Sequence, residues 1–271
     1  MDKTAASCYV FSKASGMLAS SYTGKRVSIL KSVKSLEELW SLLFTEDIPS
    51  VSQTELVKLI EKKAAEKFVK EYKTLLYSYS KPAQVCVELL DSFEKLNFEN
   101  NFDTDCVRKL YKAAEKLPLA EREEVKKIIA EKYSIQNILW VLRLKVYYKL
   151  SAEEIKKQIF YFDESKGADD VLAQEALKIV NWNVDDSALW SNWKYAKLFS
   201  QNSSSGFKLD LISAEQKAAE DFNIKMRRAF HKEPFTSLVL VSWFFIKQSE
   251  FDLIRSVSEA CRLNVKLEQA I

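Results

Sequence analysis

A long stripe of apolar residues at helical spacing constrains this chain more than any other feature. Between residues 55 and 79 an apolar side chain recurs every three or four positions, with glutamate and lysine on the opposite side: Leu56, Ile60, Ala64, Phe68, Tyr72 and Leu75. This period predicts an amphipathic helix with one buried face. The chain also has only four glycines and four prolines in 271 residues, too few for the many tight turns of an all-β fold. We therefore predict an all-α protein.

Similar patterns predict helices over most of the remaining chain. The expected ranges are 6–20, 28–43, 83–98, 103–116, 120–131, 171–180 and a long helix from residue 213. Thr54 is the expected N-cap of helix 55–79, and Ser151 opens a capping box with Glu154. Residues 134–149 are apolar on nearly all sides, which predicts a segment at the centre of a lobe. Residues 200–210, rich in serine, are expected to form a flexible loop.

Two segments of the chain share a plan of long helix, proline, apolar helix and charged residue. Pro82 precedes Lys95 by 13 residues, and Pro234 precedes Lys247 by the same interval. After each lysine we expect a second short helix, so that each segment is a helical hairpin. A hairpin of this kind cannot bury its apolar face alone, and copies must pack against one another. The sequence leaves open whether they form a solenoid or a closed ring.

The chain lacks the residue patterns on which most enzymatic chemistry depends. Gly24-Lys25 does not continue as a P-loop, because Arg26 stands where Ser or Thr must bind Mg²⁺. The one histidine in the sequence, His231, lies near Pro234, where we expect a surface or helix-end position. The four cysteines are far apart and are interpreted as reduced thiols, and the carboxylates alternate with lysines as on solvated helix faces. We predict no catalytic residue, no cofactor and no metal site.

Charge and hydropathy limit the kinds of partner. The formal net charge is +3, and Lys and Arg are interleaved with Glu, so a nucleic-acid partner is not expected. The longest apolar run, residues 238–246, is about half the roughly 20 residues that a helix needs to span a bilayer. The N-terminus lacks the continuous apolar core of a signal peptide. We expect a soluble cytoplasmic chain with no direct membrane span, which reaches a membrane only through a partner.

Three stretches of the chain resemble, in the same order, the C-type subunit of the bacterial and archaeal V/A-type rotary ATPases, which is called the d-type subunit in the eukaryotic V-ATPase. They are YVFSKASGMLASSYTG followed by SLEELWSLL, NILWVLRLKVYYKLSAEEI, and FHKEPFTSLVLVSWFFIKQSEFDLIRSV with its Lys-x-x-Glu pattern. The chain departs from the family pattern at Lys13 and Ser15, where arginines are common, and at Cys261 and Asn264, where glycine turns are usual.

The resemblance implies an all-α funnel of three similar helical lobes in a pseudo-threefold arrangement, here at residues 1–101, 102–180 and 181–271. It implies a non-catalytic subunit that is monomeric when isolated and peripheral on the cytoplasmic face of the membrane. Its partners would be the central shaft subunits (D/F type) and the proteolipid of the membrane rotor ring, between which it would transmit torque. The alternative is a generic α-helical repeat scaffold that binds proteins or peptides.

The candidate partner-binding residues are cations and an aromatic residue outside any catalytic pattern. One group lies at the first helix break and is expected to meet polar loops of the rotor ring: Tyr22, Lys25 and Arg26. The second group lies within apolar helices: Arg143, Lys145, Arg255 and Arg262. These four side chains either cap helix C-termini and extend over apolar surface, or line the funnel and pair with acidic groups of the shaft.

Overall fold

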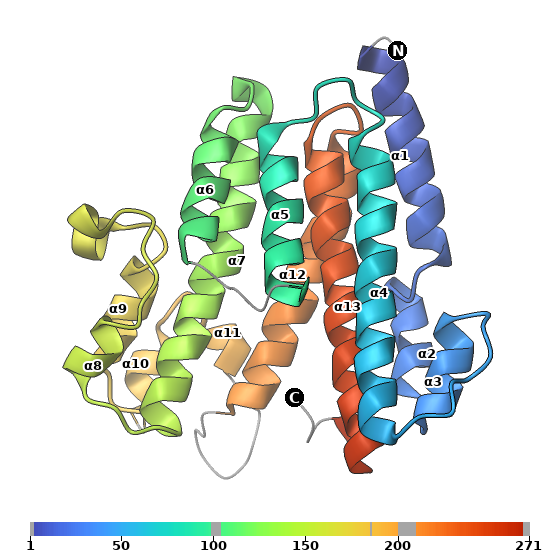
Figure 1. Cartoon of the computed structure of the whole chain (residues 1–271). Coiled ribbons are helices and arrows are strands. Elements are labelled where there is room, and N and C mark those ends of the chain that lie inside the picture. The colour runs from blue at the N-terminus through green and yellow to red at the C-terminus, as the bar shows by residue number, and fades with distance from the viewer. Residues whose placement is uncertain (1–2, 99–103, 185, 200–209, 268–271) are drawn as a thin grey trace. The chain divides into compact units, whose positions relative to one another are not determined.

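The computed structural model describes residues 3–98, 104–184, 186–199 and 210–267, and in these ranges all regular secondary structure is helical (Figure 1). This confirms the all-α prediction. The chain divides into two compact units, one made of residues 1–102 with 223–271 and the other of residues 103–222. Among the described residues, no helix combines the length and the apolar character needed to cross a membrane.

The first unit is built around two long helices, α4 and α13, which lie side by side (Figure 1). The predicted stripe of α4 is buried from Leu56 to Leu75, and Phe68 stacks on Phe93 with 4.2 Å between ring centroids. The helices of this unit are α1 (Lys3–Ser20), a 3₁₀ turn η1 (Gly24–Arg26), α2 (Val27–Lys31), α3 (Leu36–Leu43), α4 (Gln53–Leu76), α5 (Gln84–Phe98), the last part of α12 (Leu211–Lys232) and α13 (Leu238–Leu263).

Helix α13 is the central element of the first unit. It contacts α1, α2, α3, α4 and α5, and every residue from Leu238 to Ile246 is buried. A helix that is apolar on all sides has no solvent face, so it is stable only when other helices surround it. Tyr72 of α4 stacks on Trp243 of α13, with ring centroids 5.8 Å apart. The longest apolar run of the sequence is therefore the middle of a helical core.

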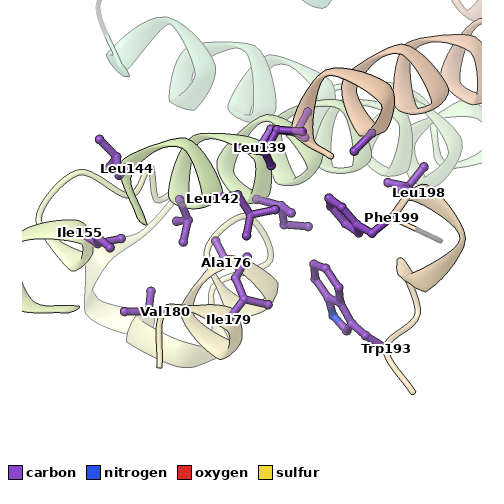
Figure 2. Close-up of a cluster of buried hydrophobic side chains, with 14 of the residues drawn as sticks. Leu139, Leu142, Leu144, Ile155, Ala176, Ile179, Val180, Trp193, Leu198 and Phe199 are labelled. Carbon is purple, nitrogen blue, oxygen red and sulfur yellow. The ribbon is translucent and has the colours of Figure 1, made fainter. Parts of the chain in front are cut away.

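The second unit has a core of its own, formed where α7 packs on α9. Leu139 and Leu142 of α7 lie near Ala176 and Ile179 of α9, with Trp193 at the edge (Figure 2). The elements of this unit are α6 (Thr104–Glu115), α7 (Leu119–Val146), α8 (Ala152–Lys156), a 3₁₀ segment η2 (Glu164–Asp169), α9 (Gln174–Val180), α10 (Ser187–Ser191), α11 (Ala196–Phe199) and the first part of α12.

Two helix boundaries differ from the prediction because other serines act as the caps. The helix expected over 28–43 is interrupted, since Ser35 caps α3 by accepting a hydrogen bond from the Glu38 N–H at 3.1 Å. The N-cap of α4 is Ser52 rather than Thr54, and Ser52 forms a capping box with Glu55. The capping box of Ser151 with Glu154 is confirmed.

Other boundaries differ because the chain continues as a helix where a break was expected. Residues 120–131 and most of 134–149 form the single helix α7, since the intervening residues include no glycine or proline. The hairpins expected after Pro82 and Pro234 are single helices, α5 and α13. Residues 200–209 of the expected loop lie outside the described residues. The three lobes at 1–101, 102–180 and 181–271 stay a prediction.

Candidate interaction surface

The α1–α2 loop, residues 21–26, holds the first group of predicted partner-binding residues in a fixed arrangement. The Tyr22 hydroxyl donates to the Leu42 carbonyl at 2.9 Å. Arg26 lies over the Tyr22 ring, with its Cζ 4.9 Å from the ring centroid, and Nη1 donates to the Ala19 carbonyl at 2.9 Å. Lys25 is exposed, and its ammonium forms no hydrogen bond or ion pair with the residues that the structure describes. The loop thus presents one free ammonium on an anchored backbone.

A group of charged side chains on α4 and α13 holds this loop in place. Lys247 and Glu250, one turn apart on α13, are 6% and 7% exposed and form an ion pair. The Lys247 ammonium also lies 3.3 Å from Glu71 Oε2 on α4 and donates to the Ser21 hydroxyl at 2.9 Å. Glu250 uses its other oxygen to accept the Tyr22 backbone N–H at 2.5 Å. Buried charges persist only when they are paired in this way.

These charges join the α1–α2 loop to two helices that are distant from it in sequence. Glu71 comes from α4, Lys247 and Glu250 from α13, and Ser21 and Tyr22 from the loop itself, and together they line a cavity of about 50 Å³. A backbone N–H bound by a buried carboxylate has little freedom to move, because breaking the bond would leave both groups unpaired. We interpret this buried charge network as the anchor of the α1–α2 loop.

The cations of α7 do not act together, although they are two residues apart. Arg143 Nη2 lies 2.6 Å from Glu215 Oε1 on α12. Lys145 instead donates to carbonyls at the end of α9, at 3.1 Å to Ile179 and 2.7 Å to Val180, and also to the Trp182 carbonyl. Burial lowers the pKa of Lys145 from its usual value. An ammonium has three donors, so these bonds favour the helix-capping interpretation of Lys145.

The cations of α13 lie two turns apart on one helix. Arg255 has a side chain that is 49% exposed, and its Nε lies 3.5 Å from Glu61 Oε1 on α4. Arg262, in the last turn, donates from Nε to Glu259 Oε2 at 2.7 Å. Both pairs leave donors of the guanidinium free to reach another molecule.

The structure brings together Tyr22, Lys25 and Arg26 in the α1–α2 loop. Arg255 and Arg262 belong to α13 of the same unit, and Arg143 and Lys145 belong to the second unit. The buried charge network beneath the loop was not predicted from the sequence. The signal for Lys247 and Glu250 was a pair of opposite charges at i and i+3 directly after an apolar run. Glu71 gave no signal, because it lies among the other charges of α4.

The groups considered for other chemistry lie at separate places. His231 is exposed in the last turn of α12, which confirms a helix-end position, and its ring centroid lies 6.1 Å from that of Phe11. All four cysteines are free, with Cys86 and Cys106 buried. In the described ranges, no three His, Cys, Asp or Glu residues are grouped so that they could hold a metal ion.

The comparisons with known proteins cover nearly the whole chain. The family model described as ATP synthase (C/AC39) subunit matches residues 19–270. The chain is also similar to an uncharacterized protein of Treponema pallidum (strain Nichols), with 20% identity over 96% of this chain and 93% of that protein. No solved structure matches the chain significantly. Because the family model covers nearly the whole chain, as the three resembling stretches predict, this protein belongs to the ATP synthase (C/AC39) subunit family.

Proposed function

We propose that this protein is a non-catalytic central-rotor coupling subunit of a V/A-type ATPase. It links the membrane proteolipid ring to the central shaft and transmits torque during ATP-driven or ion-driven rotation. The observation that carries this proposal is the family match over residues 19–270. The protein is peripheral on the cytoplasmic face of the membrane, and its three lobes form the funnel that receives the end of the shaft.

The α1–α2 loop is the surface that we assign to the rotor ring. A contact that transmits torque must not yield, and a loop held by side chains on neighbouring helices yields less than one held by its own backbone alone. Glu250, Lys247 and Leu42 supply those contacts to residues 21 and 22. The Lys25 ammonium is left free for a polar or acidic group of the ring.

Arg255 and Arg262 of α13 are the cations that we assign to the shaft. Arg255 is half exposed and its ion pair with Glu61 is long, so that pair contributes little to stability. An acidic group of a partner can therefore compete for the guanidinium at small cost. Arg143 is also partly exposed, at 40%, but its ion pair with Glu215 is short, so it would reach the shaft through its remaining guanidinium donors.

The test is affinity capture of the tagged full-length protein from gently solubilised native membranes, followed by mass spectrometry. We expect the wild type to recover both the ring proteolipid and the shaft subunits. Lys25→Glu should recover less ring, and Arg255→Glu less shaft, because each variant places a carboxylate where a cation met an acidic group. Lys58→Glu, an equal charge change at an exposed position of α4, is the control and should recover both partners.

The result that would overturn the proposal is recovery of neither partner by the wild type from membranes shown to contain an intact motor. The generic helical-repeat scaffold would then be the better account. If Lys25→Glu and Arg255→Glu both recover as much ring and shaft as Lys58→Glu, the two assigned surfaces are wrong, while the coupling role itself stands.

A further inference from the structure

Arg227 lies against the α1–α2 loop and is not among the residues that the sequence singled out. It belongs to the part of α12 that is in the first unit. A Cβ atom placed on Gly24 would lie 2.8 Å from Arg227 Nη1, 3.1 Å from Cζ and 3.2 Å from Nη2. The guanidinium therefore packs directly on the loop backbone. Position 24 favours glycine because its φ of +60° is one that other residues rarely adopt, and a side chain there would also push the Arg227 guanidinium aside.

The Arg227 guanidinium is partly buried, and no carboxylate in the described part of the chain pairs with it. It makes no hydrogen bond or ion pair with any residue that the structure describes. Burial lowers the pKa of Arg227 from its usual value, and no acidic group offsets this effect. Taking a cation out of water without a partner costs folding free energy. A residue that destabilises its own fold in this way is typical of a binding site that is completed by another molecule.

The surroundings of Arg227 carry more positive charge and one apolar side chain. Lys25 and Arg26 follow Gly24 directly, and the exposed Lys25 ammonium has no partner among the described residues. Ile224, one turn before Arg227 on the same face of α12, is 47% exposed. Arginine is enriched in protein–protein contacts, and the exposed Ile224 adds apolar area that a partner can cover.

We propose that Arg227 and Lys25 form a carboxylate-binding site for an acidic loop of the rotor-ring proteolipid. The inference rests on the proposed function and deepens it, since it names the chemistry that the α1–α2 loop recognises. The guanidinium offers parallel N–H donors that match the two oxygens of a carboxylate, and Lys25 adds a second cation at the loop tip. Gly24, against which the guanidinium packs, belongs to the same loop as Tyr22 and Arg26, which are already assigned to the ring.

An anionic lipid headgroup has related chemistry but fits the surface less well. Electrostatic attachment to a membrane uses clusters of about 4–8 Lys or Arg side chains. Here only Lys25 and Arg227 have side chains without a partner among the described residues of this site. The third cation, Arg26, is held on Tyr22 and the Ala19 carbonyl. A small site with one partly buried guanidinium favours a single, well-placed carboxylate over a charged surface.

The experiment measures binding of the full-length protein to purified, detergent-solubilised rotor ring at several salt concentrations. Arg227→Gln is expected to weaken binding about tenfold or more, because it leaves the ring carboxylate unpaired in the contact. Arg227→Lys should fall between, since it keeps the charge but loses the paired donors. Arg228→Gln removes a neighbouring exposed cation and is the matched control, with little change expected.

Two further measurements make the result specific. The thermal midpoint of Arg227→Gln should equal or exceed that of the wild type, because the variant removes an unpaired, desolvated cation; loss of binding is then not loss of folding. Ring whose surface carboxylates have been amidated with a water-soluble carbodiimide and glycinamide should bind the wild type and Arg227→Gln equally weakly.

The other possible results each contradict a different part of the proposal. If the wild type binds ring and Arg227→Gln binds it equally well, the site is wrong although the proposed function stands. If the difference between them persists on amidated ring, the partner group is not a carboxylate. If Arg227 is needed instead for binding to vesicles that contain phosphatidylglycerol, the partner is a lipid. If the wild type does not bind ring at all, the proposed function fails first.

Discussion

A lysine that is 6% exposed keeps its charge only when carboxylates surround it, and Lys247 has Glu250 on its own helix and Glu71 on α4. The charges in this group are unequal in number, since two carboxylates share one ammonium. Glu250 is further stabilised by the Tyr22 N–H, and Lys247 by the Ser21 hydroxyl. Removing the lysine would leave the buried Glu250 and the partly buried Glu71 without the ammonium that pairs with both.

We predict that Lys247→Ala lowers the free energy of unfolding by about 3–5 kcal/mol, the cost of breaking a buried ion pair from one side. Urea denaturation at neutral pH measures this. Lys58→Ala, at an exposed position of α4, should change it by less than about 0.5 kcal/mol. Adding Glu250→Gln to the Lys247 variant should cost less than the two single changes together, because one unpaired acid is removed. A Lys247→Ala variant as stable as Lys58→Ala would show that the pair is not a structural anchor.

At the scale of an element, α13 shows how the backbone conformation of one residue ends a helix. Asn264 follows Leu263 with φ 52° and ψ 44°, and its N–H donates to the Cys261 carbonyl at 3.2 Å. This left-handed conformation is the usual place of glycine after a helix, and asparagine is the next most tolerant residue. The asparagine that departs from the family's glycine turn therefore performs the same role in the backbone.

Asn264→Gly is expected to leave stability unchanged or raise it by up to about 0.5 kcal/mol, and Asn264→Ala to lower it by about 1 kcal/mol, because alanine is strained in the left-handed region. Thermal unfolding followed by circular dichroism measures both. Asn192→Gly makes the same exchange at the end of α10, where φ is −89°. It should be destabilising, because glycine relieves no strain there, adds freedom to the unfolded chain and removes the hydrogen bond from the Asn192 side chain to the Ala188 carbonyl at 3.2 Å. If alanine at 264 is harmless, the turn does not require its conformation.

At the scale of the whole molecule, each of the two units buries its own core. In the first unit the aromatic rings of α4, α5 and α13 pack together, as in the contact of Phe68 with Phe93. In the second unit Leu142, fully buried, lies in the cluster between α7 and α9 (Figure 2). Because the cores are separate, each unit can unfold locally without the other: a cavity made in one core does not remove contacts from the other.

We predict that Leu142→Ala, which costs about 2–5 kcal/mol locally, raises amide hydrogen exchange in α7 and α9 but not in α4 and α13. Leu75→Ala, at an equally buried site of α4, should give the reverse pattern. Hydrogen-exchange mass spectrometry of the full chain measures both. Equal acceleration in all four helices in either variant would show that the chain opens as one cooperative body.

The sequence by itself determined the fold class, the buried stripe of α4 and the family. The spacing of apolar residues and the scarcity of glycine and proline favour helices through local effects. The order of the three resembling stretches identifies the family even where single residues differ from its pattern. Local chemistry also located the α1–α2 loop, because Gly24 and its neighbours interrupt a helix in any context. It misplaced a break in α7, which passes through residue 134 because the residues before it include no glycine or proline to end the helix.

Only the tertiary structure determined which group each charged side chain contacts. Lys247 and Lys95 occupy equivalent places in the two repeated segments, yet Lys247 is buried between carboxylates and Lys95 is only partly buried. Lys145 caps α9, and the Arg227 side chain packs on Gly24 with no ion pair to any described residue. Neither arrangement can be predicted from the spacing of residues around these two positions. A charge acquires its role from groups that are distant in the chain and close in space, so periodicity reports which face a residue is on but not which partner it meets.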